Sequence, residues 1–131
     1  MRLLLDTHVF LWYITNDQHL APALASAIRG EANEVYLSVV SIWEALVKHQ
    51  GGRLDLPSPA DRYLLEKQDQ HRIVSLPLEA GAAARVLTLP AIHRDPFDRM
   101  LICQAIHHGL ILATVDEHIA SYPVQQFPSG R

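Results

Sequence analysis

The chain has 131 residues, of which 49% are hydrophobic and 19% charged, and its formal net charge is −3 with histidine neutral. This length fits one domain with a sizeable core, so the sequence predicts a single domain over residues 1–131 whose tail frays from about residue 127. The low net charge argues against a protein that coats DNA through a basic surface, but it does not exclude a nucleic acid held through metal ions.

The single cysteine and the N-terminal apolar run bear on the cellular compartment. Cys103 has no second cysteine with which to form an internal disulfide, and its apolar surroundings predict a buried, reduced thiol. The apolar run at residues 3–5 is shorter than a signal peptide or a membrane-spanning helix requires. We therefore expect a cytoplasmic protein that makes no membrane contact.

Strand and helix patterns alternate along the chain. Short apolar runs typical of buried strands occupy residues 2–5, 34–38, 72–76 and 110–114, with a possible edge strand at 123–127. Helices are expected at residues 8–14, 21–30, 38–52, 58–71, 77–87, 95–109 and 116–122. This alternation predicts an α/β domain around a mostly parallel sheet of four or five strands.

Three of the expected helices carry more specific expectations. In helix 38–52 the apolar residues follow helical spacing and predict one buried stripe, made of Val39, Ile42, Trp43, Leu46 and Val47. Helix 58–71 has Ser58 as a possible cap and Pro59 in its first turn, while Gly81 weakens helix 77–87. Gly51–Gly52 and Gly109 are expected to end two helices.

Four acidic residues fall where ligands bind in such folds, beyond the carboxyl ends of parallel strands. Asp6 follows the first strand and Asp116 follows the fourth, whereas Glu44 and Asp98 lie in the first turns of helices. Clustered carboxylates repel one another unless a cation lies among them, and Mg²⁺ or Mn²⁺ accepts such oxygen ligands. The sequence therefore predicts that these four acids form one metal site.

Structural roles compete with this interpretation. Ser41 and Glu44 have the spacing of a capping box, and Glu44 with Lys48 has that of a surface ion pair. Asp95 fits a helix cap with Pro96 at the first helical position, so it is either a ligand or a cap. Asp116 has the position of a cap for the expected last helix.

The histidines give no recognisable motif. The chain has eight of them, which suggests a metal, but neither H-E-x-x-H nor paired Cys/His spacing occurs. Residues 93–95, His-Arg-Asp, match part of a kinase catalytic loop, yet the chain is too short for a kinase and lacks a Gly-rich phosphate loop. No histidine was therefore assigned to the site.

Four segments together resemble the PIN-domain ribonucleases, in particular the VapC-type toxins of bacterial toxin–antitoxin pairs. The segments are LLLDTHVFLW, SVVSIWEALVK, HRDPFDRMLICQA and LILATVDEHI, in the family's order and at its spacing. The resemblance covers essentially the whole chain and implies a three-layer α/β/α sandwich. His8 and Ile119 depart from residues common in the family, which bears on substrate fit more than on chemistry.

The resemblance also implies an activity and partners. It implies a Mg²⁺- or Mn²⁺-dependent endoribonuclease that acts as a toxin, forms a homodimer and is occluded by a cognate antitoxin. The family's acidic quartet, which holds the metal, corresponds to Asp6, Glu44, Asp98 and Asp116. Further candidates for supporting or phosphate-contacting roles are Thr7, Lys48, Arg94, Asp95, Arg99 and Thr114.

Other classes share part of this pattern. A receiver domain needs an acceptor Asp after its third strand and a Lys after its last. Residues 72–80 contain no Asp, and residues 110–118 contain no Lys. A phosphatase of the Asp-x-Asp-x-Thr type needs an acid where His8 stands. A catalytically silent PIN-like protein-binding module remains the alternative, because only the four retained acids argue against it.

The segment 10–14 is apolar on every side, so part of it is expected to remain open to a protein partner. We expect Trp12 to be partly exposed in the isolated protein and covered by an antitoxin segment in the complex.

Overall fold

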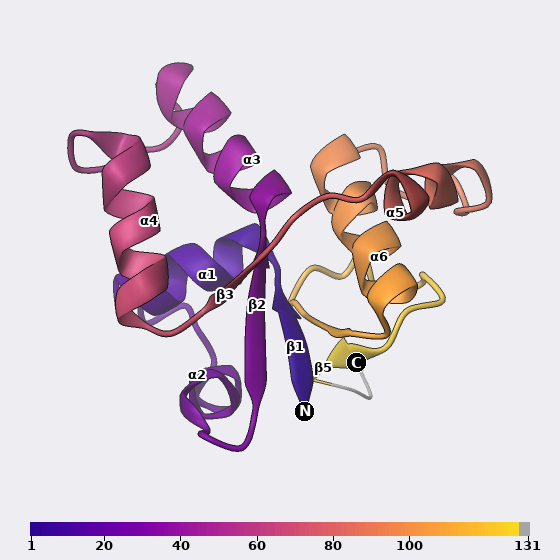
Figure 1. Ribbon diagram of the computed structural model, residues 1–131, viewed down its shortest axis with the longest axis horizontal. Helices are drawn as coiled ribbons and strands as arrows, with labels where there is room; N and C mark the ends of the chain where they lie inside the picture. Colours follow the sequence, from indigo (N-terminus) through magenta and orange to yellow (C-terminus); the bar gives the residue numbers. More distant parts are fainter. Residues whose placement is uncertain (129–131) are drawn as a thin grey trace.

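Strand β1 (Arg2–Leu5) lies at the centre of a five-stranded sheet with the order β3-β2-β1-β4-β5 (Figure 1). This computed structural model describes residues 1–128. Each neighbouring pair of strands is parallel, as predicted. The other strands are β2 (Glu34–Ser38), β3 (Val74–Leu76), β4 (Ile111–Ala113) and β5 (Gln126–Phe127).

The run of three leucines in β1 follows from burial on both faces of the sheet. Leu3, Leu4 and Leu5 are completely buried; Leu3 and Leu5 belong to one core cluster and Leu4 to the other. A strand covered on both sides cannot alternate apolar with polar residues, because each face needs apolar side chains. The apolar run therefore ends where the strand ends, at Leu5.

Helices cover both faces of the sheet and form three layers. Figure 1 shows α1, α2 and α4 on one side of the strands and α5 and α6 on the other, with α3 at the carboxyl end of β2. The bounds are α1 (Thr7–Ile14), α2 (Pro22–Arg29), α3 (Val39–Gln50), α4 (Ala60–Gln70), α5 (Ala80–Ala84), the 3₁₀ turn η1 (Arg85–Leu87) and α6 (Pro96–His108). The predicted α/β/α sandwich is confirmed.

The predicted buried stripe of α3 is partly wrong, since Ile42 and Leu46 pack against the core but Val39 and Trp43 do not. Val39 and Trp43 are 40% and 60% exposed, whereas the buried side chains of this helix are Val40, Ser41, Glu44 and Ala45. Helix α3 packs its small and polar side against α1 and α6 at the end of the sheet rather than lying flat on the strands. Apolar periodicity alone does not reveal this orientation, because the inward face carries a carboxylate.

The predicted helix at residues 116–122 is absent; the chain makes successive turns instead. Asp116 Oδ1 accepts the backbone N–H of His118 at 2.9 Å, a side-chain turn that competes with helix formation. Ile119 and Tyr122 are nevertheless buried and pack in the core cluster beside α6. The helical spacing of apolar residues thus reflects a folded loop.

Smaller differences concern helix ends. Pro59 occupies the N-cap position of α4 without a side-chain cap, so the suggested Ser58 cap is wrong. Gly51 and Gly109 end α3 and α6 as predicted, and Gly109 adopts a left-handed φ of 66°. Gly81 lies in α5, where a Cβ would come 2.9 Å from the ring of His107, so the glycine permits close packing of α5 on α6.

The C-terminal expectation is partly wrong. Phe127 belongs to β5, and its carbonyl accepts the N–H of Thr114 at 3.1 Å, so this residue is not frayed. Residues 129–131 lie outside the described part of the chain. Cys103 is a buried free thiol, as predicted, and burial raises its pKa. Across residues 1–128, the helices are too short or too polar to cross a membrane.

Candidate active site

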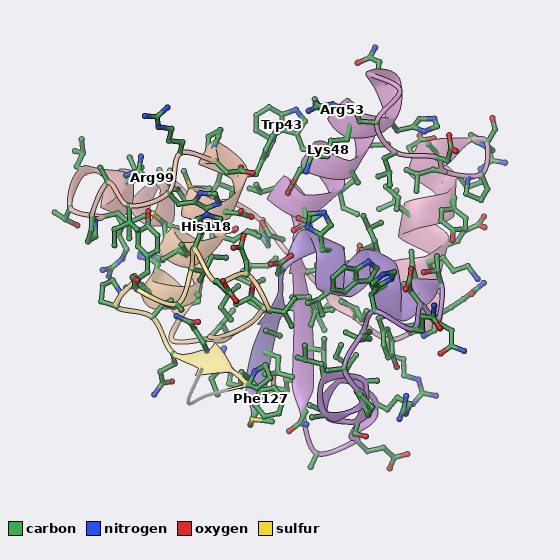
Figure 2. The ribbon with its side chains drawn as sticks, turned by 180° about the vertical axis from the view of Figure 1, so that it is seen from behind. Trp43, Lys48, Arg53, Arg99, His118 and Phe127 are labelled. Carbon is green, nitrogen blue, oxygen red and sulfur yellow. The ribbon has the colours of Figure 1, made fainter. Side chains whose placement is uncertain are left out.

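The four predicted acids converge at the carboxyl edge of the sheet. Asp6 follows β1 directly and Asp116 lies just beyond β4, while α3 supplies Glu44 and the first turn of α6 supplies Asp98. Asp98 interacts electrostatically with both Asp6 and Glu44. Figure 2 shows Lys48 of α3 on one side of this edge and His118 on the other.

Asp6 has a structural role that its sequence position did not reveal, because it caps α1. Its Oδ1 accepts the backbone N–H of His8 at 2.8 Å, and its Oδ2 accepts the hydroxyl of Thr114 at 2.7 Å. The carboxyl group is almost completely buried. Burial raises the pKa of Asp6 above its ordinary value, although the bond from Thr114 opposes the shift.

Glu44 is only 2% exposed and has two side-chain donors. Thr7 Oγ1 donates to Glu44 Oε1 at 2.7 Å and also lies 2.9 Å from Ser41 Oγ. Lys48 Nζ donates to Glu44 Oε2 at 2.5 Å, so the i,i+4 pair considered from the sequence does form. The capping-box alternative is wrong, because Ser38 caps α3.

The carboxyl group of Asp98 has a strongly raised pKa. Burial, followed by the nearby carboxylates of Asp6 and Asp95, raises its pKa to about 7, while His93 opposes the shift. His93 Nε2 lies 2.9 Å from Asp98 Oδ2. Asp95 caps α6 by accepting the N–H of Phe97 at 2.8 Å, which confirms the cap interpretation without removing Asp95 from the neighbourhood.

Two histidines that the sequence did not assign to the site lie among the acids. His93 Nε2 is 3.8 Å from Asp116 Oδ2, and His118 Nδ1 is 3.0 Å from Asp116 Oδ1. The two imidazole rings stack, with centroids 4.9 Å apart and an interplanar angle of 12°. Each histidine is within five residues of a predicted acid, and this proximity was the available signal.

Thr114 connects the two strand-end acids. Besides its bond to Asp6, its hydroxyl oxygen accepts the backbone N–H of Asp116 at 3.1 Å. Thr114 is completely buried, so its hydroxyl holds the Asp6 carboxylate and the Asp116 backbone in fixed relative positions. A supporting position for Thr114 at the site is therefore consistent with the geometry.

Of the two arginines considered as phosphate contacts, one has a backbone partner and the other is open to solvent. Arg99 Nη2 donates to the carbonyl of Leu89 at 3.5 Å and so contacts the loop before α6. Arg94 is exposed. Lys48, already bound to Glu44, is the basic side chain that the structure places directly on a site carboxylate.

The donor set suits a divalent cation. Carboxylate oxygens are the ligands that Mg²⁺ and Mn²⁺ prefer, and repulsion between Asp98 and its acidic neighbours is relieved when a cation lies among them. Single potential ligand atoms of His93, Asp95 and Asp98 lie within 4.8 Å of one another, as do those of His93, Asp116 and His118. The residues present thus fit a metal site.

This fold is that of a PIN domain. The PIN domain family model matches residues 3–125, and the chain belongs to this family. The chain is 31% identical over 120 residues to "Ribonuclease VapC22" of Mycobacterium tuberculosis, and the match covers 91% of this chain and 90% of that protein.

Solved structures share the fold at lower sequence identity. The crystal structure of VapBC2 from Rickettsia felis, bound to a DNA fragment from its promoter, includes a chain with a TM-score of 0.70 and 14% identity; the match covers 96% of this chain and 97% of that chain. FitAcB from Neisseria gonorrhoeae gives a TM-score of 0.62 and 22% identity, with coverage of 95% and 96%. These likenesses establish the fold.

Proposed function

We propose that this protein is a metal-dependent endoribonuclease that acts as the toxin of a toxin–antitoxin pair. The observation that carries the proposal is the convergence of Asp6, Glu44 and Asp98 with Asp116 at one edge of the sheet, two of them with raised pKa values. Perturbed carboxyl groups in one cluster are typical of functional sites. The similarity to a protein named ribonuclease supports the same activity.

Asp6, Asp98 and Asp116 would hold Mg²⁺ or Mn²⁺, with Glu44 beside them. Such an ion, when bound, neutralises charge on a phosphodiester and makes water a better nucleophile. Glu44 is placed to orient the attacking water or to take its proton, because Thr7 and Lys48 fix the carboxylate. Thr114 holds Asp6 and the Asp116 backbone in register.

A hollow beside α1 is the proposed antitoxin contact. It has a volume of about 390 Å³, and its walls include His8, Leu11, Trp12, Leu54, Leu56 and Tyr63. Trp12 is half-buried in the isolated protein, which agrees with the expectation from the sequence. VapBC-5 of Mycobacterium tuberculosis is described as a member of a family of toxin–antitoxin systems, and its structure shares this fold with a TM-score of 0.57 and 19% identity.

Two further expectations belong to this proposal. The PIN resemblance implies a homodimer, and the exposed Val39 and Trp43 side chains of α3 offer an apolar surface for it. The alternative function is a silent PIN-like module that binds protein but cleaves nothing. RNA cleavage distinguishes the two functions, because a silent module would bind the antitoxin and leave RNA intact under every metal condition.

The deciding experiment is RNA cleavage by the purified protein with Mg²⁺, with Mn²⁺ and with EDTA. We expect cleavage with metal, none with EDTA, and none from the Asp98→Asn variant. Glu66→Gln is the matched control, because Glu66 is an exposed carboxylate on α4. Equal cleavage by the Asp98→Asn variant and the wild type would contradict the assignment, and a folded wild type without cleavage would favour the silent module.

A further inference from the structure

The site contains nitrogen donors as well as carboxylates. We propose that His93, Asp116 and His118 form a mixed nitrogen–oxygen position that binds a transition-metal ion such as Zn²⁺ or Co²⁺ in preference to Mg²⁺. This inference rests on the proposed function and deepens it, since it names a second metal position that shares Asp116 with the carboxylate site of Asp6, Glu44 and Asp98.

The first step of the argument is geometric. Single potential ligand atoms of His93, Asp116 and His118 all lie within 4.8 Å of one another. Asp116 presents one oxygen to each ring, with Oδ2 at 3.8 Å from His93 Nε2 and Oδ1 at 3.0 Å from His118 Nδ1. An ion bound here would have ligands from two separate loops. His93 lies in the loop before α6, and Asp116 and His118 lie in the loop after β4.

The second step concerns how firmly the ligands are held. The buried Tyr122 hydroxyl accepts the backbone N–H of His93 at 2.7 Å and that of Ile92 at 3.2 Å, so it fixes the loop before α6. On the other loop, Asp116 Oδ1 accepts the N–H of His118 at 2.9 Å. These bonds fix the backbone at both histidines before any ion arrives, which lowers the ordering cost of binding.

The third step is ligand chemistry. Carboxylate oxygens suit Mg²⁺ and Mn²⁺, whereas imidazole nitrogen suits Zn²⁺ and other late first-row ions. His118 is 72% exposed, so its ring can adjust to the coordination geometry that an ion requires. The carboxylate group and the histidine position therefore differ in the ion that each prefers.

A different role for His93 makes the opposite prediction. If His93 only occupied the space of a cation between Asp98 and Asp116, removing it would free both carboxylates and tighten metal binding. If His93 is a ligand, removing it weakens Zn²⁺ binding. The sign of the change in affinity therefore separates the two roles.

A second histidine cluster supplies the matched control. Glu79, His107 and His108 also have potential ligand atoms within 4.8 Å, at the far end of α6. There, however, Arg85 Nε donates to His107 Nδ1 at 3.1 Å, so a cationic side chain already contacts the ring. We therefore expect His107→Gln to leave Zn²⁺ binding at the proposed position unchanged.

The test is calorimetric titration of the metal-free full chain with Zn²⁺ and separately with Mg²⁺, without RNA. We expect His93→Gln and His118→Gln each to weaken Zn²⁺ binding by roughly tenfold or more. Removing even a residue that only hydrogen-bonds to a metal ligand typically weakens metal affinity by about this factor. Mg²⁺ binding should change less than Zn²⁺ binding, because all the carboxylates of the site are retained in both variants. Absorption of bound Co²⁺ should change in the same two variants, because a nitrogen ligand is lost.

Three results would overturn the inference: tighter Zn²⁺ binding in His93→Gln, unchanged Zn²⁺ binding in both variants, or a loss that follows His107→Gln instead. None of these results bears on RNA cleavage by the wild-type protein with Mg²⁺, which is measured separately, so the proposed function would stand. Melting curves without metal check that the variants fold. If His93→Gln does not fold, the exposed His118 decides the question alone.

Discussion

Thr114 Oγ1 donates a 2.7 Å hydrogen bond to Asp6 Oδ2, and this bond joins the ends of two adjacent parallel strands, β1 and β4, at the candidate active site. The partners are 108 positions apart in the sequence. The same oxygen accepts the N–H of Asp116, so one buried hydroxyl sets the relative position of two acids. A residue with no charge thus contributes to the electrostatics of the site.

The Thr114→Val variant should lose most of its RNA cleavage rate but only part of its free energy of unfolding. Valine keeps the shape but leaves Asp6 Oδ2 without this donor, which costs about 1–3 kcal/mol of unfolding free energy for a buried group. Thr114→Ser should restore cleavage, because serine retains the hydroxyl. Exposed Thr88, changed to Val, is the control. Normal turnover by Thr114→Val at saturating metal would show that the bond has no role in the chemistry.

The stability of the metal-free protein should depend on pH through Asp98. Its pKa is raised to about 7 in the folded state, mainly by burial, whereas the ordinary value is 3.8. The folded state therefore holds this proton more tightly than the unfolded state. That stabilisation is present below pH 4 and is lost as pH rises toward 7. Melting curves in EDTA should show this decline, and Asp98→Asn should flatten it.

Metal should reverse this trend. Protons and Mn²⁺ compete for Asp98, so the rise in melting temperature on adding Mn²⁺ should grow from pH 5 to pH 8. Melting curves with and without Mn²⁺ at each pH measure the difference. A metal effect that shrinks over this range, or that is equally large in Asp98→Asn, would mean that the ion binds elsewhere.

The Asp6→Asn variant should be inactive yet more stable than the wild type when no metal is present. Asparagine keeps an oxygen that can cap α1, while the charge that repels Asp98 is removed. Thermal melts in EDTA should therefore move upward, and the response to Mn²⁺ should largely disappear. A lower melting temperature without metal would indicate that capping by a charged group outweighs the repulsion.

Changing Trp12 to Ala should weaken antitoxin binding more than it lowers the melting temperature. Trp12 is half-buried, lines the hollow beside α1 and stacks on His19 with ring centroids 5.7 Å apart. Leu87→Ala is the control, because Leu87 is 88% exposed in η1 and does not line the hollow. Binding assays with the cognate antitoxin and melting curves provide both readouts. A large loss of stability with unchanged affinity would identify Trp12 as a core residue.

Self-association should depend on the exposed face of α3. Trp43 is 60% exposed and makes an edge contact with Phe97, with ring centroids 4.9 Å apart, so the aromatic surface is held in a fixed orientation. Trp43→Ser should shift the mass measured by light scattering from dimer toward monomer without lowering the melting temperature of the monomer. A dimer of unchanged affinity would show that another face is used.

The sheet could be predicted from the sequence because its strands are covered on both faces. Continuous apolar runs such as Leu3–Leu5 leave few alternatives, and turn residues separate them. The orientation of α3 could not be predicted in this way, since its inward face carries Glu44 and its outward face carries Trp43. Periodicity detects a helix, but it assumes that the apolar side faces inward.

The acids of the site were predictable, and its histidines were not. Asp6 and Asp116 follow strands directly, so the parallel sheet places them at one edge. His93 reaches the site through a loop whose path depends on Tyr122, almost thirty positions later. A metal motif can be recognised in a sequence only when its ligands have a fixed spacing. His93 and His118 come from separate loops, so their spacing matches no such motif.

The order of the acids along the chain has a consequence for synthesis. They stand at positions 6, 44, 98 and 116, and the central strand β1 acquires its second neighbour, β4, only after residue 110. A ribosome releases the N-terminal part first, so a growing chain holds at most half of the carboxylates until α6 emerges. Interrupted translation products therefore contain β1, β2 and two acids but no complete site, and a potentially harmful activity appears only when almost the entire polypeptide has been made.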